Sequence, residues 1–227
     1  MNSIQLFLNS GASVVIYTGG AGKGGSYTGL LKLKQYLLEG HSCAVVMRNK
    51  PDLKTFGGVF TTSKEILSQE IHYENKLELF LIMKNGATLS FLTPEEITDR
   101  KFDYIFVDNA SQVDEAYTLD FFFKKSNKQL IMNTNSTKDR GFIFNLVKPY
   151  LVEHEDYYEF DKEKNGWIYD GVQVIHGTFK DNTKILDIYP DYPKQLACLS
   201  RIDKFKLLYG HYIKSEFMYK SGITYKD

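Results

Sequence analysis

Residues 14–26 read VVIYTGGAGKGGS, an apolar run that leads into a segment with five glycines. An apolar run of this kind is typical of a buried strand, and the leucines that follow Ser26 have the spacing of a helix. Glycines let the backbone bend so that successive N–H groups point at an anion, and the first turn of a helix adds a partial positive charge. The segment therefore predicts a phosphate-binding loop between a strand and a helix.

This loop departs from the phosphate-loop pattern G-x-x-x-x-G-K-[ST]. Gly19 and Gly24 match the two glycines, and Ser26 matches the hydroxyl that ligates Mg²⁺ in such loops. Gly25 stands where the pattern has lysine, and the lysine of the loop is Lys23, two positions earlier. A lysine side chain is long enough to reach a phosphate from either position, so Lys23 is the predicted phosphate ligand.

Two other interpretations of the loop remain open. A different alignment, on K-G-G-x-G-K-[ST], resembles the loop of ParA-type ATPases, but Thr18 then replaces its first lysine and Gly24 its hydroxyl. The second interpretation is a glycine-rich turn between strand and helix that binds no ligand. We favour a ligand, because five glycines in seven residues are costly to order without a use.

Apolar runs of strand length recur along the chain and alternate with helical patterns. The expected strands cover residues 14–17, 43–47, 77–82, 87–92, 104–107, 129–133 and 172–176, and the expected helices cover residues 26–39, 63–70, 113–125, 142–147 and 193–209. This alternation predicts an α/β fold with a mostly parallel central sheet flanked by helices. Residues 77–80 and 88–92, with Asn85-Gly86 between them, predict a β-hairpin on that sheet.

The composition excludes several classes of protein. The 227 residues include 28 Lys and Arg against 28 Asp and Glu, so no overall charge draws the chain to nucleic acid or membrane. No apolar run approaches the roughly 20 residues that span a bilayer. Cys43 and Cys198 form neither a disulfide framework nor a zinc cluster, as expected in a reducing cytosol. A secreted, membrane or zinc-finger protein is therefore excluded.

Residues 102–108 form a second motif, a largely apolar strand that ends in Asp108. A nucleotide site needs such a carboxylate to hold Mg²⁺. Hydrolysing enzymes commonly have a glutamate next, which orients the attacking water, whereas this chain has Asn109. An amide positions water but takes up no proton, so either Gln112 or Glu115 replaces the glutamate or hydrolysis is slow or absent. A helix cap is the alternative role of Asp108.

The order of these segments resembles the ATPase domain of the large terminase subunit of tailed bacteriophages, the motor that packages DNA. The resemblance spans about residues 12–227, and five parts of the sequence carry it: residues 17–26, residues 45–48 with 52–54, residues 105–112, residues 130–135, and residues 176–182 with 209–211. They are similar to the family's phosphate loop, a strand and the helix after it, the Walker B segment, the coupling motif and the close of the domain. The resemblance implies a P-loop NTPase fold of the RecA-like (ASCE) class.

The resemblance also implies ATP and Mg²⁺ as cofactors and gives roles to matching residues. Nucleotide contacts are expected from Gly19, Gly20, Gly22, Lys23, Gly24, Gly25, Ser26, Tyr27, Asn133 and Thr134. Ser26 is the expected ligand of Mg²⁺, and Asp108 is expected to hold the ion through water. The expected catalytic residues are Lys23, Asp108, Asn109 and Arg100. Arg100 is included because Ala21 replaces the arginine of the family's loop, and a surface ion pair is its alternative role.

The implied function is an ATPase motor that couples ATP hydrolysis to translocation of double-stranded DNA into the procapsid. The implied partners are double-stranded DNA, the portal protein and the small terminase subunit. The chain would form a homo-oligomeric ring on the portal, be a monomer alone, and act in the host cytoplasm away from membranes. Residues 121–150 carry six basic residues and one acid. Contacts to DNA phosphates are expected from five of these residues, with a solvated face as the alternative: Lys124, Lys125, Lys128, Lys138 and Arg140.

Residues 1–215 are the expected P-loop ATPase domain. Residues 216–227 would begin a linker toward a nuclease domain that we expect to be absent, so no nuclease activity is expected. Gly25 and Asn109 support an alternative function, a degenerate nucleotide-binding or structural domain with little or no hydrolysis. A different P-loop enzyme, helicase-like or ParA-like, is a third possibility.

Overall fold

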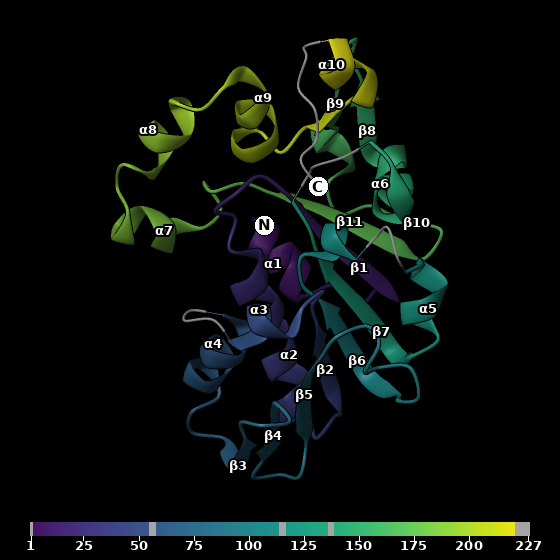
Figure 1. Cartoon of the computed structure of the whole chain (residues 1–227), viewed down its shortest axis with the longest axis vertical. Coiled ribbons are helices and arrows are strands. Elements are labelled where there is room, and N and C mark those ends of the chain that lie inside the picture. The colour runs from purple at the N-terminus through teal and green to yellow at the C-terminus, as the bar shows by residue number, and fades with distance from the viewer. Residues whose placement is uncertain (1, 55–57, 114–116, 136–138, 221–227) are drawn as a thin grey trace.

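A computed structural model describes residues 2–54, 58–113, 117–135 and 139–220 of the chain. Within these residues nine strands form one sheet, in the order β10-β11-β1-β7-β6-β2-β5-β4-β3. In that order the strands are Ile168–Tyr169, Val172–Gly177, Val14–Gly19, Ser126–Asn133, Phe102–Val107, Cys43–Val46, Thr88–Leu92, Phe80–Met83 and Ile71–Asn75. Every pair from β11 to β5 is parallel, whereas β10, β4 and β3 join antiparallel at the two edges (Figure 1).

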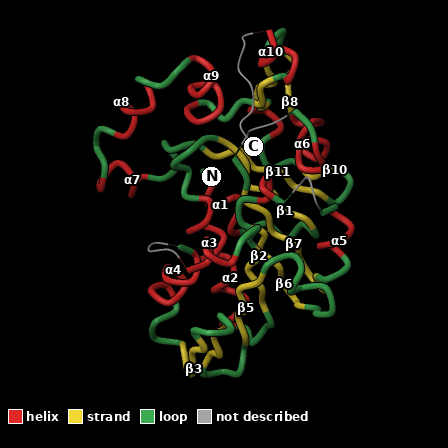
Figure 2. Tube along the Cα trace, in the orientation of Figure 1, coloured by secondary structure: helices red, strands yellow, loops and turns green. Residues whose placement is uncertain are grey.

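Helices cover both faces of the parallel strands, which explains why these strands are apolar at successive positions. In β1, Val15 and Tyr17 pack into one cluster of buried side chains, while Val14 and Ile16 pack into another. The first cluster includes residues of α1 (Ser3–Leu8), α2 (Gly25–Leu38) and α4 (Val59–Ile66), and the second includes residues of α5 (Leu119–Phe123) and α6 (Gly141–Val147). Figure 2 shows these two sets of helices on opposite sides of the strands. Each large apolar side chain buried in this way stabilises the fold by about 1.5–3 kcal/mol.

The parallel register brings the last residues of four inner strands together. Tyr17 of β1 pairs with Asn133 of β7, and Val107 of β6 pairs with Met132 of β7 and with Val46 of β2. We call this the carboxyl end of the sheet, and the beginnings of the same strands its amino end. The loop after β1 and the segments after β2, β6 and β7 all start at the carboxyl end, where open α/β sheets bind their ligands.

The remaining elements lie around this sheet. A second sheet contains β8 (Leu151–Glu153), β9 (Tyr157–Phe160) and β12 (Tyr212–Ile213). The other helices are α3 (Lys50–Lys54), η1 (Ala110–Gln112), η2 (Lys148–Tyr150), η3 (Lys162–Lys164), α7 (Thr183–Ile188), α8 (Tyr192–Ala197), α9 (Arg201–Asp203), η4 (Lys204–Leu208) and α10 (Ser215–Lys220). Figure 1 shows α7, α8 and α9 as an arm beyond the end of β11. Among the described residues, no helix combines the length and apolar character needed to cross a membrane.

The α/β class, the mostly parallel sheet and the hairpin are confirmed. Predicted helices at 26–39 and 142–147 correspond to α2 and α6 within one residue at each end. The hairpin pairs β4 with β5, and Gly86 in its turn has a φ of 85°. The first strand of the hairpin begins later than predicted, because Leu79 has a positive φ of 54° that no strand accommodates.

Three helix predictions were wrong in extent. Of the helix expected at 113–125, only α5 forms in the described part, because Thr118 is extended and its hydroxyl caps a new helix by accepting from the Phe121 N–H. The helix expected at 193–209 is divided into α8, α9 and η4, because Ser200 caps α9 in the same way. The helix expected at 63–70 lies four residues earlier, as α4, and is followed by β3.

Candidate nucleotide site

The glycine-rich loop follows β1 at the carboxyl end of the sheet and leads into α2. Gly24 immediately precedes α2, and its φ of 78° lies in the left-handed region that favours glycine. Gly24 has no side chain to cap the helix, which leaves the first N–H groups of α2 for an anion. The local geometry is therefore that of a phosphate-binding loop.

Lys23 is the buried cation of this loop. Its side chain is nearly inaccessible, with 2% of the residue exposed, and its Nζ donates a hydrogen bond to Asn135 Oδ1 at 2.6 Å. Burial lowers the pKa of the ammonium to about 7, while the Asp108 carboxylate acts in the opposite direction. A lysine kept in such surroundings is stabilised in its charged form by an anion that enters beside it.

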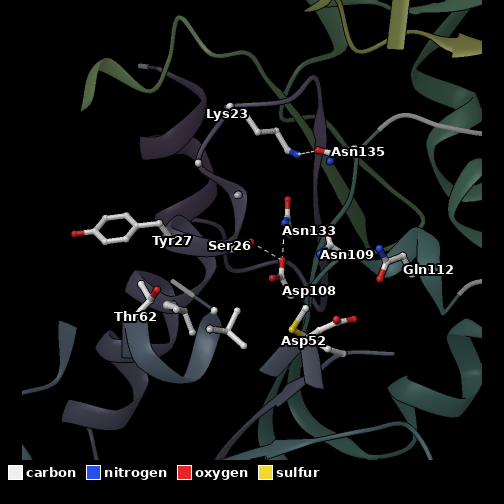
Figure 3. Close-up of a pocket in the computed structure, with 17 residues that line it drawn as sticks. Lys23, Ser26, Tyr27, Asp52, Thr62, Asp108, Asn109, Gln112, Asn133 and Asn135 are labelled. Carbon is white, nitrogen blue, oxygen red and sulfur yellow. Dashed lines mark hydrogen bonds between the residues drawn. The ribbon is translucent and has the colours of Figure 1, made fainter. Parts of the chain in front are cut away.

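Asp108 is the buried carboxylate opposite this lysine, immediately after β6. Its Oδ1 accepts hydrogen bonds from Ser26 Oγ at 3.0 Å and from Asn133 Nδ2 at 2.6 Å (Figure 3). Burial raises the pKa of the Asp108 carboxyl, although the hydrogen bonds from Asn133 and Ser26 and the charge of Lys23 oppose this effect. The hydroxyl and the carboxylate that the sequence singled out are thus in direct contact.

Gly25 and Asn133 fit against each other, which explains why the loop has no lysine at position 25. A Cβ added to Gly25 would lie 1.9 Å from Asn133 Oδ1, much closer than non-bonded atoms approach each other in proteins. Asn133 is itself buried, and its Oδ1 has no hydrogen-bond partner among the described residues. The carboxamide of Asn133 therefore fills the space through which a side chain at position 25 would pass.

A cavity of about 680 Å³ connects these residues, which is large enough for a nucleotide. The polar and charged side chains that line it are Lys23, Ser26, Tyr27, Asp52, Thr62, Asp108, Asn109, Gln112, Asn133 and Asn135. They come from the loop after β1 and from the segments after β2, β6 and β7, together with α2 and α4. Figure 3 shows the labelled side chains arranged around this cavity.

The oxygen atoms near Asp108 suit a magnesium ion. Ser26 Oγ and the Asp108 carboxylate, which are in contact, are hard oxygen ligands. Mg²⁺ commonly takes one or two protein carboxylates and completes its shell with water and substrate phosphates. Within the described residues, no group of three or more His, Cys, Asp or Glu side chains forms a separate metal site. These residues therefore fit an ion that arrives with a phosphate substrate.

The structure brings together most of the residues predicted for the site but not all of them. Gly22, Lys23, Gly24, Gly25, Ser26, Tyr27, Asp108, Asn109 and Asn133 line the same cavity. Gly19 and Gly20 do not line it: Cβ atoms added to them would lie 2.0 Å from Gly177 O and 2.5 Å from Leu207 O. The side chain of Thr134 is buried away from the cavity, where its hydroxyl donates to the Asn135 carbonyl.

Arg100 lies at the other end of β6 from Asp108. Its guanidinium donates to Ser90 Oγ at 3.1 Å and stands over the ring of Phe102, with 5.1 Å between the guanidinium carbon and the ring centre. Six residues of extended strand, Phe102–Val107, separate it from Asp108. Arg100 therefore does not reach the cavity of its own chain.

The predicted DNA-contact residues do not form one surface. Lys124, Lys125 and Lys128 lie at the amino end of the sheet, around the start of β7, whereas Arg140 precedes α6 beyond the other end of β7. Lys124 pairs with Asp120, Lys125 donates to the Thr98 carbonyl, and Lys128 contacts the ring nitrogens of His41. Lys138 lies outside the described residues.

Asn135 and Asp52 are among the cavity residues that sequence reasoning missed. Asn135 was visible as the last residue of the Asn133-Thr134-Asn135 motif after β7, but its partner Lys23 is 112 residues away in the chain. Asp52 belongs to the short helix α3, and nothing in the local pattern shows that β2 lies next to β6. Both residues follow the carboxyl end of a parallel strand, which is the signal that would have found them.

No protein-family model and no curated protein matches this chain by sequence. Solved structures do match. The large terminase of a thermophilic bacteriophage superposes with a TM-score of 0.68 at 12% identity over 93% of this chain and 53% of that chain. The same terminase in complex with ATP-gamma-S gives 0.68 at 9% identity over 91% of this chain and 51% of that chain.

Two further structures match. The large terminase ATPase domain of Thermus phage P74-26 gives a TM-score of 0.60 at 11% identity over 91% of both chains. The N-terminal domain of the DNA packaging ATPase from bacteriophage phi29 gives 0.51 at 13% identity over 76% of this chain and 93% of that chain. The chain thus has the fold of phage large terminase ATPase domains, as predicted, and spans about half the length of the first of these terminases. At these identities the likeness establishes the fold alone.

Proposed function

We propose that this chain is the ATPase domain of a phage DNA-packaging motor and binds ATP at the carboxyl end of the sheet. The observation that carries the proposal is the convergence of Lys23, Ser26 and Asp108 on one cavity. The three groups supply a cation for phosphate, a hydroxyl and a carboxylate for Mg²⁺, which a phosphoryl-transfer site requires. The fold shared with large terminases, one of them in complex with ATP-gamma-S, supports the same function.

In this proposal different residues of the site bind different parts of Mg²⁺-ATP. N–H groups between Gly22 and Ser26 contact the phosphates, and the Lys23 ammonium turns from Asn135 to the terminal phosphates. Ser26 and Asp108 hold Mg²⁺, which supplies charge neutralisation at the phosphates. Asn133, which touches both Gly25 and Asp108, is the residue best placed to sense whether the γ-phosphate is present.

The binding of ATP is expected to be coupled to protonation of Lys23. With a pKa of about 7, Lys23 is partly neutral at pH 7 and above before any ligand arrives. Bound phosphate oxygens favour the charged ammonium and raise the pKa of Lys23 again. Binding above pH 7 is therefore accompanied by proton uptake.

The larger assembly follows from the terminase-like fold. We propose double-stranded DNA, a portal protein and a small terminase subunit as partners, with the ring on the portal formed in the host cytoplasm. Arg100 would then act only on a neighbouring subunit's nucleotide, since it does not reach its own cavity. The basic residues near the start of β7 are the proposed DNA contact. Residues 216–227, which overlap α10, are the proposed linker.

Calorimetric titration with Mg²⁺-ATP tests the proposal. Wild type should bind one ATP per chain, and Lys23→Ala should weaken binding by about 100-fold, which is the loss expected when a buried charge-assisted phosphate contact is removed. Lys76→Ala, at an exposed lysine far from the loop in the sequence, is the matched control and should bind like wild type. No saturation with millimolar ATP, or equal affinity in both variants, would refute the phosphate-loop assignment.

A second function is favoured by one specific observation. Asn109 occupies the position after Asp108 with a φ of 51°, and its amide cannot accept a proton from water. A chain that binds Mg²⁺-ATP but releases no phosphate in the presence of linear double-stranded DNA would be a nucleotide-dependent structural domain.

A further inference from the structure

A general base that accepts a proton from the attacking water would accelerate hydrolysis of ATP at this site. Asn109 cannot be that acceptor, because a carboxamide has no useful basicity at neutral pH. Asp108 is also unsuitable, since Ser26 and Asn133 already donate to its Oδ1 and it is the residue that fits Mg²⁺. A general base for the proposed turnover would therefore be another side chain of the cavity.

Asp52 is the one further carboxylate among the described residues that line the cavity. It lies in the first turn of α3, which follows β2. Because β2 is the parallel neighbour of β6, with Val46 opposite Val107, the segment after β2 reaches the cavity beside Asp108 and Asn109. Figure 3 shows Asp52 on one side of Asp108 and Lys23 on the other, with Asn109 and Gln112 near the same wall.

Asp52 stands at the wall of the cavity, on a turn that packs against the core. The residue is partly buried, whereas only 2% of Asp108 is exposed. The side chain of Asn49 approaches Asp52 Oδ2 at 3.5 Å. The neighbouring Leu53 is fully buried in the core and fixes this turn of α3 against the sheet. A carboxylate on a fixed turn at a cavity wall has the placement of a general base.

We propose that Asp52 is the catalytic base of this ATPase and replaces the glutamate that usually follows the strand-end aspartate. The inference rests on the proposed function. The water oxygen forms a bond to the γ-phosphorus while the bond from that phosphorus to the β–γ bridging oxygen breaks. A proton of the water passes to the Asp52 carboxylate, the bridging oxygen leaves with the electron pair as part of ADP, and Asp52 then returns the proton to solvent.

Substitution at Asp52 tests this assignment with two separate readouts, phosphate release and calorimetric binding of Mg²⁺-ATP, both with linear double-stranded DNA present. Asp52→Asn preserves size and should lower kcat by roughly 100-fold or more, the usual contribution of a general base, with ATP affinity nearly unchanged. Asp52→Glu keeps the carboxylate and should recover part of the rate. Asp99→Asn, an exposed aspartate, is the matched control and should behave like wild type.

Two rival residues are tested in the same assay. Glu115 lies outside the described residues, and Gln112 lines the cavity. Glu115→Gln and Gln112→Ala should each retain most of the turnover. Turnover near the wild-type rate in Asp52→Asn, or its loss in Glu115→Gln alone, would overturn the assignment. Wild type that binds ATP without releasing phosphate would overturn it together with the hydrolytic part of the proposed function, while absence of binding would refute the nucleotide site itself.

Discussion

Strand β6 has an aspartate near each end, and the two are held in opposite ways. Asp103, at the amino end, accepts from the Ser42 N–H at 3.0 Å and from Ser42 Oγ at 3.1 Å, close to solvent and to the ring of His41. Asp108, at the carboxyl end, is buried beside Lys23, and burial shifts the pKa of each of these groups toward its neutral form. One end of the strand has an arrangement that stabilises the fold, and the other has one that opposes it.

The difference between the two ends of β6 supports placing the proposed site at the carboxyl end of the sheet. Buried charges that lack full compensation destabilise a protein, so they persist where a ligand completes them. The basic residues near the amino end each have a protein partner, as Lys124 has Asp120 and Lys125 has the Thr98 carbonyl. At the carboxyl end Lys23 has a neutral amide as its hydrogen-bond partner, and Asn133 Oδ1 has none among the described residues. Substitutions at the two ends should therefore separate activity from stability.

The sharpest test is the same substitution at both aspartates. Asp108→Asn should lower phosphate release by roughly 100-fold or more, because the carboxylate proposed to hold Mg²⁺ is lost. It should also raise the thermal midpoint of the ligand-free protein at pH 7. The folded pKa of Asp108 is raised above its ordinary value of 3.8, so the stability from this group is present below that pH and is lost as pH rises through the folded pKa.

Asp103→Asn should have the opposite effects on activity and on stability. It should keep ATP binding and turnover and lower the free energy of unfolding by about 0.5–1.5 kcal/mol, since hydrogen bonds to a carboxylate are weakened. Phosphate release and thermal unfolding of both variants measure the contrast. If both variants lose stability and neither loses activity, the distinction between the two ends of the sheet is wrong.

Gly25→Lys should disable the loop although it restores the usual pattern. The new side chain would collide with Asn133, so we expect a loss of about 1–3 kcal/mol in the free energy of unfolding, typical of overpacking, and weaker ATP binding. Gly25→Ala with Asn133→Ala should be less destabilised than the sum of the single changes, because the pair shares one contact. Urea unfolding of the three alanine variants measures this coupling, and strict additivity would contradict it.

The affinity for Mg²⁺-ATP should fall as pH rises above 7. Lys23, with a pKa of about 7, must then take up a proton on binding, so affinity should decrease by up to about tenfold per pH unit. Calorimetry in buffers of different ionisation enthalpy counts that proton directly. Lys23→Arg, which stays charged, should abolish the uptake, and an unchanged proton count in that variant would exclude Lys23 as its source.

Basic residues at the amino end should give the smallest effects. Replacing Lys124, Lys125 and Lys128 together by alanine should leave ATP affinity unchanged and alter stability by no more than about 1 kcal/mol. If these residues bind DNA phosphates, affinity for linear DNA should fall, and its logarithmic dependence on salt should become shallower by up to about one for each phosphate-binding lysine removed. An unchanged salt dependence would exclude them from the DNA-binding surface.

The sequence predicts the parts of this molecule that depend on neighbouring residues. The apolar run before Gly19, the turn at Gly86 and the helix after Ser26 have local causes and form where expected. Strands β3 and β8 were missed because their residues are partly or largely exposed, so no continuous apolar run marks them. Capping by Thr118 and Ser200 divided two predicted helices, because short side-chain hydrogen bonds outweighed the longer apolar pattern.

Several contacts of the site depend on the order of the strands in the sheet, and local sequence patterns carry no information about that order. Lys23 with Asn135, and Gly25 with Asn133, meet only because β1 pairs with β7. Asp52 reaches the cavity only because β2 pairs with β6. The departure at Gly25 has a structural counterpart that the sequence does not show, since Asn133 fills the space beside Gly25 while the buried Lys23 lines the same cavity.

The most direct test of the central claim is a crystal structure of this chain with ATP-γ-S and Mg²⁺. The phosphates should lie between the first turn of α2 and Lys23, with the Lys23 ammonium on a phosphate oxygen in place of Asn135 and the metal beside Ser26 and Asp108. A nucleotide bound elsewhere, or one that leaves Lys23 bonded to Asn135 alone, would contradict the account.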